Sequence, residues 1–344
     1  MNKSSISAKK NILILFGGGG NEHKISILSK AFIKKNLATF KDLELIEVEI
    51  DHKGNWFYFN EEIVPVSLST NGEFTELKSG QYKKTQIDFV IPCIHGNPGE
   101  NGQLLAFLEM IKIPFLGNPF EPSVLCFNKM STKLWMKQFG IPVVPYICLY
   151  DLKPHSLELA QDFLEKNKDI FIKASSEGSS VGVFKISYSH KKDLEKIIEK
   201  SFSFSPYVLM EKAISGRELE ISTFFFNDKI HATLPGEIIC EKGFYDYDEK
   251  YSEQSSTKTI SQAEGISPAI SKQMQEYCIK LFHLLKLKDF CRIDFFLDKN
   301  NQLYVNEINT FPGMTPISLF PQMLQASGVD FGEFLYQCIN KKLN

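Results

Sequence analysis

Hydrophobic and polar positions in the first third of the chain follow strand and helix periods in alternation. Short apolar runs predict strands at residues 11–16, 43–50 and 88–94. Apolar positions three and four residues apart predict helices over about 23–37 and 102–111, and a short strand is expected at 113–116. Strands that alternate with helices in this way are typical of a small α/β domain with a mainly parallel sheet.

Turn-forming residues separate this unit from a second one. The run from Asn118 to Pro122 marks a boundary, a helix is expected over 123–139, and Gly140-Ile141-Pro142 ends it. Strands at 169–173 and 183–186 are joined by the loop 175–182, and another strand follows at 207–211. Because only a short loop joins the first two of these strands, we expect an antiparallel hairpin there.

The last third combines strands with one long helix. Strands are expected at 218–226 and 230–234, a polar aromatic loop covers 241–260, and an amphipathic helix lies near 266–286. Two further strands, at 291–297 and 303–309, have charged residues where a half-buried strand usually has Val or Ile. This last pair carries the most informative pattern of the chain.

Side chains on a strand repeat every second residue, so Arg292 and Asp294 share one face, as do Glu307 and Asn309. If the connection turns as a two-residue hairpin on Asn300-Asn301, pairing sets Asp294 opposite Glu307 and Arg292 opposite Asn309. A register slip of one residue would separate them. The alternative is that these residues form the solvated outer face of an edge hairpin.

Two carboxylates directly opposite each other repel, so this pairing requires a cation between them. Oxygen ligands from Asp, Glu and Asn suit Mg²⁺, which combines a few carboxylates with phosphate oxygens and water. After the second strand comes a Pro-Gly turn, and we expect a helix to begin at Thr315 with Pro316 in its first position. Backbone N–H groups at such a turn stabilise an anion. The pattern therefore predicts a metal-phosphate site.

Composition indicates an ordinary globular protein. The 344 residues suggest two or three domains, and 39 basic against 41 acidic residues give a net charge of −2, which favours neither nucleic acid nor an anionic membrane as a partner. Seven cysteines without a Cys-x-x-Cys pair indicate reduced thiols. The apolar run at 12–16 is too short for a signal peptide and no segment approaches a membrane span, so we expect a cytoplasmic protein.

A glycine-rich turn, Gly17 to Gly20, follows the first strand and leads to Glu22. The turn occupies the place of a dinucleotide-binding loop, but a carboxylate at Glu22 would repel pyrophosphate and attract a cation such as a substrate ammonium. We therefore expect an amine site. Alternatively, Glu22 caps the following helix near its positive N-terminal end.

Two further loops are candidates for ligand contacts. The loop from Glu177 to Gly182 lacks the Gly-Lys-Ser/Thr of a P-loop, yet its glycines and hydroxyls could surround phosphates, with Lys173 adding a positive charge. A plain connecting loop is the alternative. His95 follows a strand at the end where open α/β sheets bind ligands, so it is a candidate substrate contact, with a structural role in a turn as the alternative.

The segment from Phe244 to Tyr251 is too polar for a core strand and too aromatic for a plain linker. We therefore expect a lid that closes over a site, from which Lys250 and Tyr251 could reach inward. A surface loop packed by its own tyrosines is the alternative.

Together and in this order, these motifs resemble D-alanine:D-alanine ligases of the ATP-grasp superfamily, from about Asn11 to the end of the chain. The matching stretches are Leu15-Phe-Gly-Gly with Glu22-His23 and Ser26, His95-Gly with Gly99-Glu100 and Gly102, Asn128-Lys129 with Lys133, Lys173 with Glu177-Gly-Ser-Ser-Val-Gly182, Glu211 with Gly216-Arg-Glu218, Phe244-Tyr-Asp-Tyr with Lys250-Tyr251, Arg292-Ile-Asp294, and Asn306-Glu-Ile-Asn-Thr with Pro312-Gly-Met-Thr and Ser318-Leu319.

The resemblance implies a mixed α/β (α+β) ATP-grasp fold. A Rossmann-like N-terminal substrate-binding domain would span 1–121, and a two-part ATP-grasp domain would follow. Its central part would span 122–214 and its C-terminal part 215–344, with the lid loop at 241–260. The family also implies a homodimer.

The resemblance further implies ATP-dependent ligation of two D-alanines for peptidoglycan synthesis, with ATP between the central and C-terminal parts. Lys129 and Lys173 would contact phosphates, Glu211 and the backbone near Ile214 the adenine, and Glu218 the ribose. The other residues of the implied ATP site are Glu177, Ser180, Lys212 and Tyr245. Asp294, Glu307 and Asn309 would hold two Mg²⁺, with Mn²⁺ as an alternative metal.

In the implied reaction, ATP phosphorylates the carboxylate of the first D-alanine, and the amine of the second attacks the acyl phosphate. Arg292 and the N–H of Gly313 would stabilise the tetrahedral oxyanion, while Lys250 would bind the transferring phosphate. Glu22 would pair with the first ammonium, and Ser179 and Tyr251 would complete a hydrogen-bonded trio with it. The N–H groups of Ser318 and Leu319 would hold the second carboxylate.

The chain departs from the family pattern at a few positions, none of which removes a catalytic group. Gly19 and Gly20 stand where larger or polar residues are more usual, Ala174 replaces a proline, and Phe311 replaces a smaller residue. Tyr251 stands where depsipeptide-forming relatives have His, which favours peptide formation.

Two other functions fit part of the pattern. An ATP-grasp ligase for other amino acids would share the charged hairpin, but not Glu22 and the lid together. A nucleotide-binding regulatory protein would have no need of Arg292, Lys250 and Gly313, which suit a reacting phosphate and oxyanion.

Overall fold

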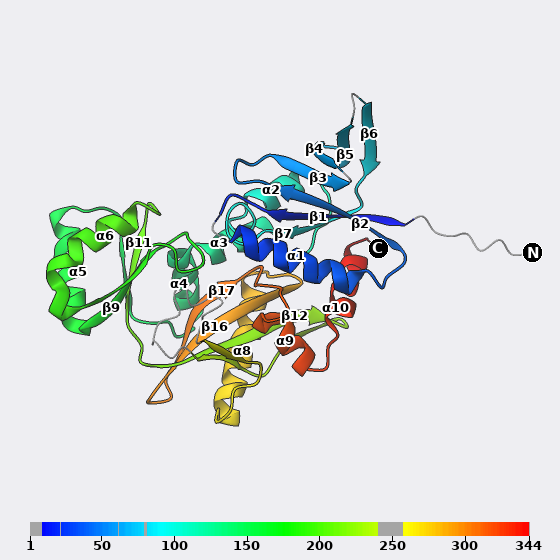
Figure 1. Ribbon diagram of the computed structural model, residues 1–344. Helices are drawn as coiled ribbons and strands as arrows, with labels where there is room; N and C mark the ends of the chain where they lie inside the picture. Colours follow the sequence, from blue (N-terminus) through cyan, green and yellow to red (C-terminus); the bar gives the residue numbers. More distant parts are fainter. Residues whose placement is uncertain (1–8, 21, 61, 79–80, 240–256, 344) are drawn as a thin grey trace, which may run out of the picture.

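The computed structural model describes residues 9–20, 22–60, 62–78, 81–239 and 257–343. Within these residues the chain forms three sheets in succession, accompanied by helices. Figure 1 shows the first sheet at the top of the view, the second at the left and the third below them. The mixed α/β class expected from the sequence is confirmed. Among the described residues, no helix has the length and apolar character needed to cross a membrane.

The first sheet has seven strands in the order β6-β5-β4-β3-β2-β1-β7. Its central strand β1 pairs in parallel with both β2 and β7. The three parallel strands are β1 (Lys10–Gly17), β2 (Leu43–Ile50) and β7 (Phe89–Cys93). Because the carboxyl ends of parallel strands meet at one edge, the loop that carries Glu22 lies beside the loop that carries His95.

Four antiparallel strands, which fall between β2 and β7 in the sequence, extend this sheet beyond β2 on the side away from β7. They are β3 (Trp56–Asn60), β4 (Glu62–Leu68), β5 (Glu73–Lys78) and β6 (Gln81–Gln86). The sequence pattern predicted no element here, and the expectation of a mainly parallel sheet is wrong. Local turn chemistry starts the extension, because Asp51 Oδ1 accepts hydrogen bonds from the N–H groups of Lys53 and Asn55, each at 2.8 Å.

Helices α1 (His23–Leu37) and α2 (Gln103–Met110) lie where the pattern predicted them. The short strand expected at 113–116 is absent from the described structure, where this segment makes only an isolated bridge between Val90 and Phe115.

The helix expected over 123–139 is two helices, α3 (Phe120–Phe127) and α4 (Lys129–Gln138). Asn128 separates them, because its extended backbone ends α3 while its side chain accepts a hydrogen bond from Ser131 N–H at 2.9 Å and caps α4. The apolar residues Cys126 and Met136 of these helices pack in the core of the third sheet. By packing, these helices therefore belong with the C-terminal unit rather than with the central one.

The second sheet is antiparallel, with the strand order β10-β9-β11-β8. Its strands are β8 (Tyr146–Leu149), β9 (Asp169–Ala174), β10 (Val183–Ser187) and β11 (Val208–Lys212). The helices of this unit are α5 (Pro154–Asn167), the short 3₁₀ helix η1 (Tyr188–Asp193) and α6 (Leu194–Phe202), and their apolar side chains pack with the sheet in one cluster. The expected hairpin around the loop 175–182 is confirmed.

The third sheet has the strand order β15-β14-β12-β16-β17, with β13 paired to β12. Its strands are β12 (Gly216–Phe226), β13 (Lys229–Ala232), β14 (Gly236–Ile239), β15 (Lys258–Ile260), β16 (Phe290–Asp298) and β17 (Leu303–Asn309). The helices of this part are α8 (Pro268–Leu284), α9 (Leu319–Ala326) and α10 (Phe331–Leu343).

Asp294 and Glu307 are direct partners across β16 and β17, and Arg292 pairs with Asn309. The pairing expected from the sequence is confirmed, but the expected two-residue turn is wrong. The N–H of Asp298 donates to the carbonyl of Gln302 at 3.0 Å, so that residues 299–301 form a three-residue turn.

A β-bulge at Asn306 restores the register. Phe295 pairs with Val305, whereas the next residue, Asp294, pairs with Glu307, so Asn306 is an extra residue on β17. The longer turn and the bulge each shift the pairing by one residue, and the two shifts cancel at the charged end of the hairpin.

The C-terminal helices join the third unit to the first. One apolar cluster contains Ile12 and Ile14 of β1 together with Phe320 of α9 and Phe334 of α10. Figure 1 shows α10 beside the first sheet. The first and third sheets therefore share a core, and residues far apart in sequence meet between them.

A polar contact lies at the same junction. Asp289 Oδ2 accepts hydrogen bonds from Gly117 N–H at 2.7 Å and from Lys342 Nζ at 2.6 Å. Burial raises the pKa of Asp289, and the nearby Lys342 opposes this effect. The contact ties the end of the first unit to the last helix.

Candidate active site

The charged end of the hairpin forms a dense ionic network. Arg292 donates from Nε and Nη2 to the two carboxylate oxygens of Asp294, each at 2.8 Å, and Nε lies 3.0 Å from Glu220 Oε2. Asn309 Nδ2 donates to Asp294 Oδ2 at 2.9 Å. Burial alone would lower the pKa of Arg292, but Asp294 and Glu220 raise it well above its usual range. The hairpin lies at the edge of its sheet, but its charged face is mostly buried and bonded within the protein, which contradicts a solvated outer face, and a permanent cation lies there.

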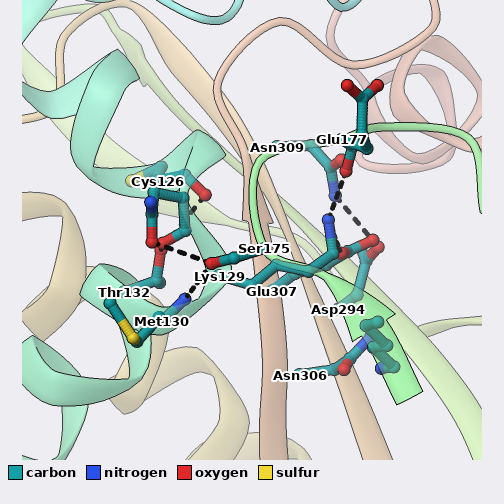
Figure 2. A network of polar contacts seen from close by, with 12 residues as sticks. Cys126, Lys129, Met130, Thr132, Ser175, Glu177, Asp294, Asn306, Glu307 and Asn309 are labelled. Carbon is teal, nitrogen blue, oxygen red and sulfur yellow. Dashed lines mark hydrogen bonds and ion pairs between the residues drawn. The ribbon is translucent and has the colours of Figure 1, made fainter. Parts of the chain in front are cut away.

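Lys129, at the start of α4, connects the hairpin to the glycine-serine loop of the second sheet. Its Nζ donates to the Glu177 carbonyl at 2.6 Å and lies 3.6 Å from Glu307 Oε2. Figure 2 shows this lysine between the two glutamates, with Asp294 and Asn309 alongside. The backbone N–H of Lys129 also donates to the Ser175 carbonyl at 2.8 Å. The predicted phosphate loop and the predicted metal ligands are thus neighbours.

A buried lysine pair shares one carboxylate behind this network. Glu211 Oε1 lies 2.5 Å from Lys133 Nζ, and Glu211 Oε2 lies 2.5 Å from Lys173 Nζ. Burial would raise the pKa of Glu211, but the two lysines lower it. Burial lowers the pKa of Lys133 despite Glu211, whereas for Lys173 the attraction of Glu211 outweighs burial and raises the pKa. Both carboxylate oxygens of Glu211, expected at adenine, therefore already contact lysines.

Lys133 was absent from the predicted site, but the structure places it there. Its side chain is only 1% exposed, and its Nζ donates to the Asn306 carbonyl at 3.3 Å. A signal for it exists in the sequence. Residues four apart on a helix share one face, so Lys133 lies on the same face of α4 as Lys129 and is directed to the same site.

The Glu22 carboxylate lies where three loops meet. Ser179 donates its hydroxyl hydrogen bond to Glu22 Oε1, which joins the first unit to the second. A Cβ atom at Gly96 would come within 2.9 Å of Glu22 Oε2, and one at Gly178 within 3.1 Å. These glycines therefore make room for the carboxylate. Glu22 is the N-cap residue of α1 and therefore lies near the positive end of that helix, as the capping alternative requires, but its side chain makes no capping hydrogen bond and accepts one from Ser179.

A cavity of about 400 Å³ opens beside Glu22 and Ser179. Its other lining residues are Gly19, Gly20, Ile50, Gly54, Gly96, Asn97, Pro98, Phe127, Glu177, Gly178 and Val181. The cavity is large enough for a small amino acid, and it has a carboxylate that suits an ammonium group.

Hydrogen bonds that the sequence pattern does not indicate hold the glycine-rich turn in place. Ser26 Oγ accepts from Gly17 N–H at 2.7 Å and donates to the Cys93 carbonyl at 2.5 Å. His23 contacts the Gly18 carbonyl through Nδ1 at 2.8 Å and Glu49 through Nε2 at 3.1 Å. Gly17 has a φ of +92°, and a Cβ there would approach the Ile50 carbonyl to 2.5 Å, so glycine is required.

His95 does not point a free nitrogen at a substrate. It is 4% exposed, its Nδ1 donates to the Phe311 carbonyl at 3.1 Å, and its Nε2 lies 2.9 Å from Ser29 Oγ. Both ring nitrogens are thus used inside the protein, because the strand end that carries His95 is covered by the loop 311–314. The expected direct substrate contact is therefore corrected to a contact with that loop.

The helix after β17 was expected to begin at Thr315, with Pro316 in its first position. This expectation is wrong: α9 starts at Leu319, and Ser318 is its N-cap residue. Ser318 Oγ accepts from Thr315 N–H at 3.1 Å, and Ser318 N–H donates to the Thr315 carbonyl at 3.0 Å. Of the two N–H groups expected at a carboxylate, that of Ser318 is thus engaged locally. Leu319 stands in the first turn of α9, whose N–H groups lack intrahelical acceptors.

The hairpin residues fit a magnesium ion bound with phosphates. Asp294, Glu307 and Asn309 offer two carboxylates and one amide oxygen on a single face. Among the described residues, no group of three or more His, Cys, Asp or Glu side chains is arranged to hold a metal by itself. A site with so few protein ligands leaves most coordination positions to other oxygens, which suits Mg²⁺ together with a nucleotide.

The remaining predicted residues fall into two groups. Lys212, Ile214 and Glu218 lie at the end of β11, in the following connection and in β12, where the second sheet passes into the third. Ser180 lies in the glycine-serine loop with a φ of +60°. Tyr245, Lys250, Tyr251 and most of the expected lid at 241–260 lie outside the described residues.

Comparisons with known proteins agree with this geometry. The family model described as D-ala D-ala ligase N-terminus matches residues 11–118, and that described as D-ala D-ala ligase C-terminus matches residues 135–340. The D-alanine–D-alanine ligase of Shewanella pealeana is 44% identical over 328 residues, which cover 95% of this chain and 96% of that protein.

Solved structures show the same likeness over the whole fold. The D-alanyl-alanine synthetase A from Vibrio cholerae superposes with a TM-score of 0.91 at 41% identity, covering 98% of this chain and 99% of that one. The VanG D-Ala:D-Ser ligase from Enterococcus faecalis is more distant, with a TM-score of 0.84 at 28% identity, covering 96% of this chain and 99% of that one.

Proposed function

The chain belongs to the D-alanine–D-alanine ligase family, and from this premise we propose how its own residues carry out the reaction. The enzyme joins two D-alanines to D-alanyl-D-alanine for peptidoglycan synthesis, with ATP converted to ADP and phosphate. The observation that carries the residue assignments is the meeting of Arg292, Asp294, Glu307 and Lys129 at the end of one hairpin.

ATP binds where the second sheet passes into the third. Lys129 and Lys173 contact its phosphates. The short distances from Lys129 Nζ to the glycine-serine loop and to Glu307 support this assignment for Lys129. Glu211 holds Lys173 and Lys133 in place. The wider ATP site comprises Glu177, Ser180, Glu211, Lys212, Ile214, Glu218 and Tyr245.

Asp294, Glu307 and Asn309 hold two Mg²⁺, which neutralise charge on the phosphates when bound. The direct pairing of Asp294 with Glu307 supports this role, since the pair supplies carboxylate oxygens from both strands. Arg292 and Lys129 already lie on these carboxylates and are positioned for the added charge of a nucleotide.

Glu22 binds the ammonium of the first D-alanine in the cavity beside Ser179, and Tyr251 completes this trio. The γ-phosphoryl group of ATP is transferred to a carboxylate oxygen of this substrate, with Lys250 on the phosphate. The result is an acyl phosphate whose carbonyl carbon is open to attack.

The amine of the second D-alanine attacks this carbon and gives up a proton with the help of the trio of Glu22, Ser179 and Tyr251. The tetrahedral oxyanion that forms then releases phosphate. Arg292 and the N–H of Gly313 stabilise the oxyanion, a role supported by the pairing of Arg292 with Asn309, the end of β17, which the Gly313 loop follows. Leu319 N–H at the start of α9, beside Ser318, receives the carboxylate of the second D-alanine.

The family resemblance supports two further proposals, that the enzyme is a homodimer and that it acts in the cytoplasm. Gel filtration with light scattering tests the first, because a homodimer would have twice the mass of the 344-residue chain. Fractionation of cells that produce the chain tests the second.

The function is tested by measuring ADP release from ATP and Mg²⁺ with D-alanine, L-alanine, D-alanine plus D-serine, or D-alanine plus D-lactate, with products identified by mass. D-Alanyl-D-alanine from D-alanine alone is the expected product. The D-serine arm matters because one structural relative is a D-Ala:D-Ser ligase. Turnover only with another amino acid would overturn the substrate, and ATP binding without turnover would favour a regulatory protein.

A further inference from the structure

Ser29 and His95 form a chain of three hydrogen bonds with the loop that carries Gly313. Met314 N–H donates to Ser29 Oγ at 3.2 Å, Ser29 Oγ lies 2.9 Å from His95 Nε2, and His95 Nδ1 lies 3.1 Å from the Phe311 carbonyl. Ser29 is fully buried and His95 nearly so. The two anchor points, Phe311 and Met314, stand on either side of Pro312 and Gly313.

Only one arrangement of protons lets a neutral His95 make both of its bonds. A carbonyl oxygen can only accept, so His95 Nδ1 must carry the proton that it donates to Phe311. In a neutral ring, Nε2 is then an acceptor and receives the Ser29 hydroxyl proton. Ser29 Oγ in turn accepts from Met314 N–H. Ser29 and His95 thus each donate to one neighbour and accept from another.

The surroundings favour this neutral form. Burial lowers the pKa of His95, while the nearby Glu22 opposes the effect and Arg292 adds to it.

A second group of contacts also secures the loop: Asn118 Nδ2 donates to the Thr310 carbonyl at 2.8 Å, and the Phe311 ring packs edge-on against Phe290 at 5.5 Å. The loop is therefore fixed on both sides of its proline.

One helix links this chain to the site of the first substrate. Glu22 immediately precedes α1, and Ser29 lies seven residues later on the same helix. Seven residues are about two turns, or roughly 10 Å along the axis, so both positions face the same side. Movement of α1 would shift the ammonium-binding carboxylate and the Gly313 loop together.

We propose that Ser29 and His95 are positioning residues that set the direction of the Gly313 N–H through the Phe311 and Met314 backbone. Neither side chain touches a reacting atom. The inference rests on the proposed role of Gly313 at the oxyanion and deepens it, because it names the groups that hold this donor in place. A donor displaced by about 1 Å would lose most of its effect on the rate.

The first test compares Ser29→Ala with Ser123→Ala. Ser123 is a matched control, because it is also fully buried and its hydroxyl donates a hydrogen bond at 2.8 Å, but to the Pro119 carbonyl at the start of α3 and not to the Gly313 loop. We expect Ser29→Ala to lower kcat about 10- to 100-fold with little change in the KM for ATP. Ser123→Ala should leave kcat within about twofold of the wild type.

A phosphinate analogue of the dipeptide separates positioning from a general loss of packing, because its tetrahedral phosphorus resembles the intermediate. Ser29→Ala should weaken binding of this analogue by about the same factor as kcat, while the Kd of D-alanine stays unchanged. Equal kcat values for the two serine variants, or equal loss of affinity for D-alanine and the analogue, would overturn the proposal.

The second test measures which ring nitrogen of His95 carries the proton. It uses the wild-type protein, so it does not depend on whether a variant folds. Nitrogen NMR of ¹⁵N-histidine-labelled wild-type protein should show His95 with a protonated Nδ1 and an unprotonated, hydrogen-bonded Nε2 at neutral pH. A proton on Nε2 would overturn the hydrogen-bonded chain whatever the activity. If the wild type makes no dipeptide while His95 has the expected tautomer, the proposed function fails and the chain of hydrogen bonds stands as a structural element.

Discussion

Glu307 faces Asp294 because Asn306 is an extra residue in β17. Had the pairing continued without the bulge from Val305 opposite Phe295, Asn306 would oppose Asp294 and Glu307 would oppose Ile293. Glu307 would then point to the other face of the sheet, where Ile293 is fully buried. A bulge therefore decides whether this hairpin has one carboxylate or two at its charged face, and the predictions for this face follow from that geometry.

Replacing Glu307 by Gln should weaken magnesium binding. The substitution keeps the shape of the side chain but removes the charge that lies 3.6 Å from Lys129 Nζ. We expect the Mg²⁺ concentration for half-maximal ADP release to rise about 10- to 100-fold. Asp298→Asn is the control, because Asp298 is a carboxylate in the turn of the same hairpin, and its magnesium dependence should stay that of the wild type. An unchanged dependence in Glu307→Gln would remove Glu307 from the metal site.

Arg292→Lys should reduce the rate more than the stability. Lysine keeps a positive charge but cannot donate two parallel hydrogen bonds to Asp294, as Arg292 does. We expect kcat to fall about 100- to 1,000-fold, the effect of losing one oxyanion donor, with a normal unfolding transition. Arg217→Lys, which alters a similar pair between Arg217 of β12 and Glu237 of β14, should leave kcat unchanged. Equal kcat values in both variants would contradict the role of Arg292.

Glu22→Gln should weaken binding of the first D-alanine without affecting ATP. The amide cannot form the charge-assisted contact with an ammonium, which corresponds to about 1.5–3 kcal/mol, or a 10- to 150-fold higher Kd. Calorimetric titration with D-alanine and separately with an ATP analogue measures both. Ser179→Ala keeps the carboxylate and removes its hydroxyl partner, so its effect on D-alanine should be smaller. Unchanged D-alanine affinity in Glu22→Gln would place the ammonium elsewhere.

Glu211→Gln should destabilise the fold, because it leaves Lys133 and Lys173 without their shared carboxylate. The loss of one partner from a buried ionic group corresponds to about 3–5 kcal/mol of unfolding free energy. Glu44→Gln breaks an exposed pair with Lys9 and should change the free energy of unfolding by less than about 1 kcal/mol. Urea unfolding of both variants at pH 7 measures the difference.

The difference in stability between the wild type and Glu211→Gln should also depend on pH. The lysines hold the pKa of Glu211 below its ordinary value of 4.5 in the folded state. The stabilisation is therefore complete above pH 4.5 and is lost as the pH falls through the lowered folded pKa. The free-energy difference between wild type and Glu211→Gln should stay constant from pH 7 to about 5 and shrink at lower pH. A difference that grows on acidification would contradict the ionic account.

Much of the site could be found from the sequence, because its signals are local. Alternation along 291–297 and 303–309 placed Arg292, Asp294, Glu307 and Asn309 on one face, and the glycine-serine loop lies on a hairpin as expected. Glu22 was recognised as an unusual carboxylate after a glycine-rich turn, and the structure sets it beside Ser179. The order of these motifs was sufficient to indicate the family.

The sequence misled wherever the outcome depended on a partner far along the chain. Periodicity could not separate α3 from α4, since only the cap at Asn128 interrupts an otherwise continuous pattern. The strands β3 to β6 are short and extend a sheet whose parallel part is formed by β1, β2 and β7. The turn of the charged hairpin was misjudged by one residue, and a bulge that pairing alone reveals corrected the register.

The kinds of elements, the chemical character of the loops and the family could be read from the chain alone, because these depend on neighbours within a few residues. Tertiary structure decided which side chains meet. Lys133 finds Glu211, and Ser29 contacts Met314, 285 positions further along the chain. The packing of separate elements also places His95, expected at the substrate, in contact with the Gly313 loop. The physical reason is that a side chain's hydrogen-bond partners and burial are set only when separate elements pack together.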